Sequence, residues 1–277
     1  MRSAITICLV PEAAGGPFVF HDGLAAGCRA AAAAGFDAVE IFPADAHSFP
    51  ADDLRKLLAS ESLHLAAVGT GAGWVRQRLS LVATDDGLRQ QAVRFVGEII
   101  DVAAEFNAPA IIGSMQGQAV NAANRPDALD RLADSLAVLA TRAGRHGQPL
   151  LYEPLNRYET NLLNDQRAAA EFLQSRGLAE AGVKLLCDLF HMNIEEADPA
   201  ATLREVGSLP GNLIGHVHWA DSNRRAMGLG HTDARAAFAA LQSSGYEGYL
   251  AAEVFPLPSA DEAARQTMAS LTALATE

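Results

Sequence analysis

Four short apolar segments in the second half of the sequence carry carboxylate and imidazole side chains. The segments are LYEP at 151–154, CDLFH at 187–191, HVHWAD at 216–221 and AAEV at 251–254. Two glutamates, one aspartate and one histidine from such segments would form an oxygen-rich site with a single imidazole. That donor set suits Mn²⁺, Mg²⁺ or Co²⁺ and leaves positions open for substrate oxygens. The sequence therefore predicts a divalent metal site, provided that the fold brings the four segments together.

Any one of these residues alone would more often be a salt-bridge partner or a hydrogen-bonded core residue. Four of them at successive strand ends favour a site, because charged groups are rarely buried without partners. The first half shows no equivalent, since the apolar segments that end at Gly69 and Gly113 carry no ionisable side chain there. We therefore expect the metal-ligating and catalytic side chains to lie in the second half of the sequence.

These segments belong to an alternation of short apolar runs and longer amphipathic stretches that repeats about eight times. The apolar runs are rich in Val, Ile, Leu and Ala, as expected for strands that are buried on both faces. The predicted strands are Ala4–Val10, Ala38–Phe42, Leu63–Val68, Ala108–Ile112, Pro149–Pro154, Val183–Leu189, Leu213–Trp219 and Tyr249–Phe255. The predicted helices are Asp22–Ala34, Ala51–Ser60, Asp85–Phe106, Pro126–His146, Gln166–Ser175, Pro199–Val206, Asp233–Ser243 and Asp261–Ala275. Eight β-then-α units favour an α/β fold, a single (β/α)₈ TIM barrel over residues 1–277, in which catalytic residues lie at the carboxyl ends of strands.

An open, doubly wound sheet is the alternative fold, and it would require a nucleotide-binding fingerprint. The nearest candidate is GTGAGW at 69–74, where Trp74 replaces the third glycine of the G-x-G-x-x-G pattern. The following WVRQRLSLV does not begin a helix clearly. We therefore expect a long loop over Gly69–Ser80 that shapes the pocket.

Four motifs resemble the xylose-isomerase-like superfamily of sugar isomerases and epimerases, and most closely its ketose 3-epimerases of the tagatose and psicose type. The motifs are YEPLNRYETN at 152–161, DLFHMNIEE at 188–196, HVHWADSNR at 216–224 and AAEVF at 251–255. The specific part of the resemblance covers the C-terminal half, roughly 152–255. The N-terminal half is similar only in its alternation of elements.

The resemblance implies four metal ligands: Glu153, Asp188, His218 and Glu253. It implies three substrate-binding residues: Glu159, His191 and Arg224. It also implies that Glu153 and Glu253 act as acid and base on opposite faces of the substrate. A metal on the adjacent oxygens would stabilise the enediolate that forms when the proton next to the carbonyl is removed. Mn²⁺ is the expected cofactor, with Mg²⁺, Co²⁺ or Zn²⁺ as alternatives.

Several neighbouring side chains have weaker claims to a role in the site. His216 shares a strand face with His218, and we expect it to be a structural core histidine rather than a donor to its neighbour. Trp219 lies on the opposite face of that strand and is expected to pack, so Trp74 is the better candidate for a lid. Asp221 could orient a ligand or simply solvate its loop.

The expected activity is C3 epimerisation of a ketose through an enediolate. Alternatives within the superfamily are a hydroxypyruvate-type aldose–ketose isomerase and a keto-inositol dehydratase, because both use the same intermediate. An apurinic-site endonuclease of the endonuclease IV type is a less favoured alternative, since its three-zinc cluster needs histidines that the earlier strands lack. A non-catalytic sugar-binding barrel would not need the pair Glu153 and Glu253.

The composition excludes other classes of partner. The chain has 33 acidic and 21 basic side chains, a net charge of −12 at pH 7, and shows no basic stripe for nucleic acid. It has no apolar run near the ~18 residues that a membrane-spanning helix needs. Its three cysteines are far apart, and the opening MRSAITICLVPEAAGG is a poor secretory signal, so we expect a cytoplasmic protein. The expected partner is a small sugar or keto-polyol, and the outer helices could support a homodimer or homotetramer.

Overall fold

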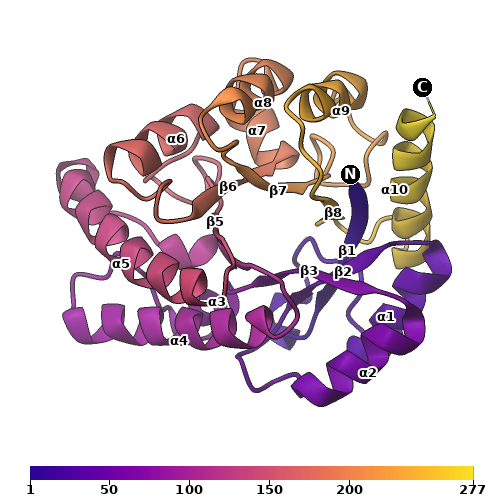
Figure 1. Cartoon of the computed structure of the whole chain (residues 1–277), viewed down its shortest axis with the longest axis horizontal. Coiled ribbons are helices and arrows are strands. Elements are labelled where there is room, and N and C mark those ends of the chain that lie inside the picture. Colours follow the sequence, from indigo (N-terminus) through magenta and orange to yellow (C-terminus); the bar gives the residue numbers. More distant parts are fainter. Residues whose placement is uncertain (277) are drawn as a thin grey trace.

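Eight parallel strands form a closed barrel in the computed structural model, which describes residues 1–276 (Figure 1). The strands pair in chain order, and β1 pairs with β8 to close the ring. Glu277, the last residue of the expected domain, lies outside the described residues. The predicted (β/α)₈ architecture is confirmed. The strands are β1 Arg2–Cys8, β2 Ala38–Phe42, β3 His64–Gly69, β4 Ala110–Ile112, β5 Leu150–Tyr152, β6 Val183–Asp188, β7 Ile214–His218 and β8 Tyr249–Ala252.

Helices follow the strands and surround the barrel (Figure 1). The α-helices are α1 Leu24–Ala34, α2 Ala51–Glu61, α3 Ala72–Gln77, α4 Asp86–Ala104, α5 Arg125–Arg145, α6 Gln166–Ser175, α7 Leu189–Glu195, α8 Pro199–Ser208, α9 Ala234–Ser243 and α10 Ala260–Ala275. The short 3₁₀ helices are η1 Pro11–Ala13, η2 Ser114–Gln116 and η3 Ala122–Asn124. Every predicted strand and helix is present, with ends within three residues of the predicted ones. Over residues 1–276, none of these helices combines the length and the apolar character needed to cross a membrane.

Small and apolar side chains fill the amino-terminal end of the barrel. Ala4, Ala38, Ala66 and Ala251 form one buried cluster, and Ala67, Ile111, Leu151 and Leu186 form another. Side chains alternate along a strand, so the next inward positions on β1 and β2 are two residues further on. The interior therefore changes from apolar to polar toward the carboxyl ends of the strands, where the predicted site lies.

The stretch Gly69–Ser80 is not the long loop that we expected, because it contains helix α3. Gly71 begins this helix and Arg78 ends it in the left-handed conformation. Trp74 lies on it, and Gly73 packs against Met115 closely enough that a Cβ would lie 2.7 Å from the Met115 sulfur. A helix of six residues is shorter than two turns, so it leaves no clear period in the sequence. The same reason explains why helix α7 was not predicted.

Candidate active site

The four predicted metal ligands meet at the carboxyl ends of neighbouring strands. Glu153 directly follows β5 and Asp188 ends β6, while His218 ends β7 and Glu253 directly follows β8. One ligand atom from each lies within 4.8 Å of the others. His218 Nδ1 is 3.3 Å from Asp188 Oδ2, 3.4 Å from Glu253 Oε2 and 3.5 Å from Glu153 Oε1. The fold thus brings together the four residues that the motifs singled out.

The surroundings of Glu153 fit a divalent cation. Its side chain is buried, and its Oε1 has no hydrogen-bond partner among residues 1–276. Burial, together with the nearby carboxylates of Glu253 and Asp188, raises the pKa of Glu153 to about 8 against the opposing effect of His218. A cation would supply a partner for Oε1 and the charge that keeps the carboxylate ionised. Three carboxylates and one imidazole are also donors that Mn²⁺ or Co²⁺ accepts.

The position of Glu153 depends on small and polar neighbours. A Cβ at Gly113 would lie 2.6 Å from Glu153 Oε2, so the glycine makes room for the carboxylate. Gln116 Nε2 donates a hydrogen bond of 2.9 Å to the carbonyl oxygen of Glu153. The Tyr152 hydroxyl donates in turn to Gln116 Oε1 at 2.6 Å. This buried chain of contacts holds the end of β5 in one place.

Asp188 uses its two oxygens for different purposes. Oδ1 caps helix α7 by accepting a hydrogen bond of 2.8 Å from the backbone N–H of Phe190. Oδ2 faces His218, and Arg224 Nη2 lies 3.1 Å from it. Burial acts to raise the pKa of Asp188, but Arg224, His191 and His218 hold it well below the usual range. Asp188 is therefore an ionised carboxylate with one oxygen aimed into the site.

His191 is oriented by Asn156. Its Nδ1 accepts the backbone N–H of Asn156 at 3.2 Å and the side-chain amide at 2.7 Å. Arg224 Nη1 lies 3.1 Å from the other ring nitrogen, Nε2, and a neutral imidazole can accept at only one of its two nitrogens at a time. Nε2 lies 3.7 Å from both Glu153 Oε1 and Asp188 Oδ2. Burial lowers the pKa of His191 to about 4, so the ring is neutral.

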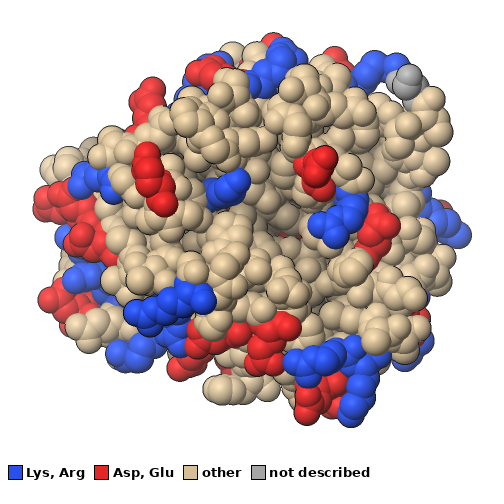
Figure 2. All heavy atoms as spheres, in the orientation of Figure 1, with Lys and Arg blue, Asp and Glu red and all other residues tan. Residues whose placement is uncertain are grey.

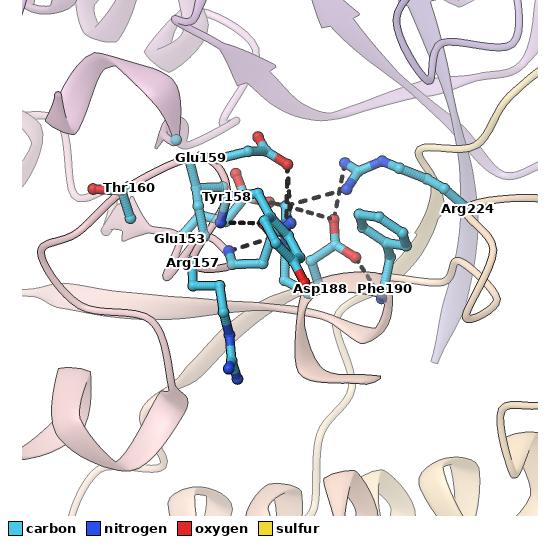
Figure 3. Close-up of polar contacts among 12 residues, drawn as sticks. Glu153, Arg157, Tyr158, Glu159, Thr160, Asp188, Phe190 and Arg224 are labelled. Carbon is cyan, nitrogen blue, oxygen red and sulfur yellow. Dashed lines mark hydrogen bonds and ion pairs between the residues drawn. The ribbon is translucent and has the colours of Figure 1, made fainter. Parts of the chain in front are cut away.

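Arg224 contacts Asp188, whereas the Glu159 carboxylate accepts a hydrogen bond of 3.0 Å from the side-chain amide of Asn156 (Figure 3). The Arg224 guanidinium is buried over the Phe190 ring, 4.6 Å from its centroid, and forms an ion pair with Glu253. The Glu159 side chain is about half exposed. All three predicted substrate-binding residues therefore lie beside the four predicted ligands.

A cavity of about 610 Å³ opens over these residues. Six of the predicted site residues line it, and Asp188 is fully buried beneath them. Its apolar walls include Phe18, Phe42, Trp74 and Phe255. Figure 2 shows a hollow near the centre of the ring, with acidic and basic side chains interspersed around it. Trp74, the candidate for a lid, therefore lies in the cavity wall, on helix α3.

Trp219 and Asp221, two of the residues with weaker claims to a role in the site, serve the fold instead. Trp219 is fully buried and packs edge-on against Phe238, as expected for its strand face. Asp221 is buried, and its carboxylate accepts backbone N–H groups of Ser222, Gly228, Gly230 and Thr232. Asp221 therefore holds its loop in shape rather than facing the cavity.

Glu40 is the residue of the site that the sequence analysis missed. It lies on β2 inside the barrel, with its carboxylate between His216 and His218. The expectation that the first half contributes nothing equivalent was therefore wrong. His216 is not simply a core histidine either, because it shares the Glu40 carboxylate with His218. The available signal was an acidic residue in the middle of the apolar run AVEIF, since a buried charge needs partners.

Comparison with known proteins agrees with this geometry. The sequence matches the xylose isomerase-like TIM barrel family over residues 28–274. The L-ribulose 3-epimerase of Mesorhizobium japonicum is 30% identical over 234 residues, which are 83% of this chain and 74% of that protein. The 3-dehydro-D-guloside 4-epimerase of Escherichia coli K12 is 37% identical over 122 residues, which are 44% of each chain.

The fold similarity extends over the whole length of the chain. A solved structure of an L-ribulose 3-epimerase has a TM-score of 0.83 at 25% identity, and the superposition covers 99% of this chain and 95% of that one. The resemblance carried by the sequence motifs is therefore confirmed. The chain belongs to the xylose isomerase-like TIM barrel family, and like its epimerase relatives it is an isomerase-class enzyme.

Proposed function

We propose that residues 1–277 form one catalytic domain, a metal-dependent epimerase that inverts C3 of a ketose. The observation that carries this proposal is the meeting of two glutamates, one after β5 and one after β8, around Asp188 and His218. The L-ribulose 3-epimerase relative supports a ketose as the substrate class. The proposed metal ligands are Glu153, Asp188, His218 and Glu253. The proposed ion is Mn²⁺, with Mg²⁺, Co²⁺ or Zn²⁺ as alternatives.

The proposed reaction moves one proton off C3 and another onto it. One of Glu153 and Glu253 takes the C3 proton, the C–H electron pair enters the C2–C3 bond, and the carbonyl electrons move to O2. A bound divalent ion would stabilise the negative charge of this enediolate. The other glutamate then gives its proton to C3 from the opposite face, which inverts the carbon and restores the carbonyl. Proton exchange with solvent returns both glutamates to their starting states.

The surrounding side chains can hold the sugar in place. The neutral His191 ring can form a hydrogen bond to a substrate hydroxyl through Nε2. The Arg224 guanidinium, lying over Phe190, donates to a second oxygen, and Glu159 accepts a hydrogen bond from a hydroxyl. Aromatic side chains on the cavity wall can cover the apolar faces of the sugar carbons.

Solvent deuterium exchange followed by NMR tests the proposed reaction. The Mn²⁺-loaded protein is incubated in D₂O with fructose, psicose, tagatose and ribulose. We expect deuterium at C3 of at least one ketose, together with its C3 epimer. Deuterium at C1 with formation of an aldose would instead indicate an isomerase. No exchange with any ketose would contradict the proposal and make hydroxypyruvate and keto-inositols the next substrates to test.

The substitution Glu253→Gln tests the two-glutamate mechanism. We expect epimerisation to slow by at least about 100-fold, because an amide can neither take nor return the proton. Glu247→Gln is the matched control, since Glu247 is exposed and precedes the start of β8 at the other end of the barrel. Metal content is measured in both variants, so that loss of the ion can be separated from loss of the base. Unchanged turnover in the metal-loaded Glu253 variant would refute the mechanism.

A 4-epimerase of a keto-glycoside is a second candidate function. The cavity of about 610 Å³ is in the range that accommodates ligands larger than a free hexose. The 3-dehydro-D-guloside 4-epimerase of E. coli K12 also matches part of the chain. The chemistry would be the same, because C4 lies next to a carbonyl at C3. Adding a 3-keto-glucoside to the deuterium experiment separates the two functions, since this candidate requires deuterium at C4.

A further inference from the structure

Glu40 is a buried carboxylate that the proposed reaction does not use. It lies on β2 with 4% of its surface exposed, facing the barrel interior. We propose that Glu40 is a positioning residue, which holds His218 with its Nδ1 toward the metal site by acting as the shared hydrogen-bond acceptor of His216 and His218. This inference rests on the metal site of the proposed function.

The contacts of Glu40 identify which ring nitrogens it uses. Its Oε1 is 3.2 Å from His218 Nε2, and its Oε2 is 2.8 Å from His216 Nε2. Both distances are those of direct N–H···O hydrogen bonds. An ionised carboxylate only accepts hydrogen bonds, so each histidine donates its Nε2–H to Glu40. A neutral His218 then carries its lone pair on Nδ1.

Nδ1 is the nitrogen of His218 that faces the site. It lies 3.3 Å from Asp188 Oδ2 and 3.4 Å from Glu253 Oε2. A 180° flip of the ring would put carbon atoms, Cδ2 and Cε1, in the places of Nδ1 and Nε2, and would break the bond to Glu40. The bond to Glu40 therefore favours both the tautomer and the ring orientation that coordination through Nδ1 requires.

His216 keeps the Glu40 carboxylate from turning. It occupies the inward position two residues before His218 on β7, and the two rings are 5.6 Å apart at 85°. Because each oxygen of the planar carboxylate accepts from a different ring, rotation of the Glu40 terminal group would break both bonds.

A second metal ion is the competing explanation, since Glu40, His216 and His218 could ligate one themselves. His218 Nε2 cannot donate a hydrogen to Glu40 and coordinate an ion at the same time. The number of ions bound per chain therefore separates the two roles. Our proposal requires one bound ion per chain.

Three variants of the full-length protein test the role of Glu40. Glu40→Leu removes the acceptor, whereas Glu40→Gln keeps an oxygen that can accept from His218. Thr6→Val is the matched control: Thr6 is buried and lies opposite Glu40 in register on β1, but it contacts Ala252 and Val19 instead of the histidines. Calorimetry gives the Mn²⁺ dissociation constant and stoichiometry, and the visible absorption of the Co²⁺-loaded protein reports the geometry at the ion.

We expect Glu40→Leu to weaken Mn²⁺ binding by about 10- to 100-fold and to change the Co²⁺ spectrum. Glu40→Gln should recover most of this loss, and Thr6→Val should leave both readouts unchanged even if it lowers the melting temperature. Equal Mn²⁺ affinity in Glu40→Leu and the wild type would overturn the proposal, as would two ions per wild-type chain. A wild-type protein that binds no metal would overturn the proposed function as well.

A measurement on the wild-type protein covers the case in which Glu40→Leu does not fold. In ¹⁵N-histidine-labelled protein loaded with Zn²⁺, NMR distinguishes the coordinated ring nitrogen from the one that carries hydrogen. We expect His218 to coordinate through Nδ1 with its Nε2 protonated. Coordination through Nε2 would show that Glu40 does not set the ring orientation.

Discussion

Arg224 lies where substrate binding and metal binding would compete. Its guanidinium forms ion pairs with Glu253 and with Asp188, two of the proposed metal ligands. A divalent ion between those carboxylates would repel the guanidinium and leave its N–H groups free for a substrate oxygen. We therefore expect the side chain to exchange its carboxylate partners for a substrate oxygen when the ion and the sugar bind.

We expect Arg224→Ala to raise KM by about 10- to 100-fold, the cost of losing hydrogen bonds from a charged group. Mn²⁺ affinity should not fall, because the substitution removes a positive charge from beside the ligands. Arg157→Ala is the matched control, since Figure 3 shows Arg157 pointing away from the site, where it pairs with Glu195. Steady-state kinetics and calorimetry check this, and an equal loss of sugar and metal binding would contradict the role.

The loop between β7 and α9 is the element that carries Arg224, and Asp221 gives it its shape. The Asp221 carboxylate accepts four backbone N–H groups from this loop, at 2.7–3.0 Å. The carbonyl of Asp221 also accepts the backbone N–H of Arg224 at 2.8 Å. Arg224 has a positive φ of 56°, a conformation that the surrounding loop must stabilise. The position of the guanidinium thus depends on a residue that does not face the cavity.

Asp221→Ala should lower the free energy of unfolding by roughly 2–3 kcal/mol, because buried N–H groups lose their acceptor. It should also raise KM, since the loop no longer fixes Arg224. Asp233→Ala is the control from the same segment. It removes only the N-cap of α9, at a cost of about 1 kcal/mol, and should leave KM unchanged. Chemical denaturation and kinetics give the two quantities, and an unchanged KM in the Asp221 variant would refute the coupling.

The whole molecule should gain stability from a bound ion, because the proposed ligands come from four different strands that only the folded barrel brings together. At 100 times its dissociation constant, Mn²⁺ should add about 2.7 kcal/mol to the free energy of unfolding. For a chain of this size that corresponds to roughly 5 °C in Tm. Differential scanning calorimetry with Mn²⁺ and with EDTA measures the difference. Identical Tm values in the two conditions would refute the metal site.

The gain in Tm should be larger at pH 8 than at pH 6. The pKa values of Glu153 and His218 are raised in the metal-free protein, that of Glu153 to about 8. Groups whose pKa is raised by folding stabilise the folded state at low pH, and this stability is lost as the pH rises through the folded pKa. The metal-free protein should therefore lose stability between pH 6 and 8. Mn²⁺ binding should strengthen over the same interval, because it displaces these protons. A gain in Tm that becomes smaller as the pH rises would contradict the raised pKa values of Glu153 and His218.

The sequence by itself determined the barrel and the four residues at its carboxyl end. The alternation of eight apolar runs with helical stretches predicts parallel strands, and parallel strands place their carboxyl ends on one rim. Glu153, Asp188, His218 and Glu253 follow neighbouring strands, so their meeting requires only that the strands pair in chain order. Helix α3 could not be predicted in this way, because it is shorter than two turns.

Only the tertiary structure decided the partners of His218 inside the barrel. Glu40 is 178 residues away in sequence and lies on β2, which is not a neighbour of β7 in the sheet. Whether inward side chains of such strands touch depends on how the barrel closes and on the stagger of its strands, and neither is encoded in a local pattern. The position of Arg224 depends likewise on loop hydrogen bonds to Asp221. Local periodicity therefore places residues on a rim or a face, and closure of the barrel decides which of them meet across it.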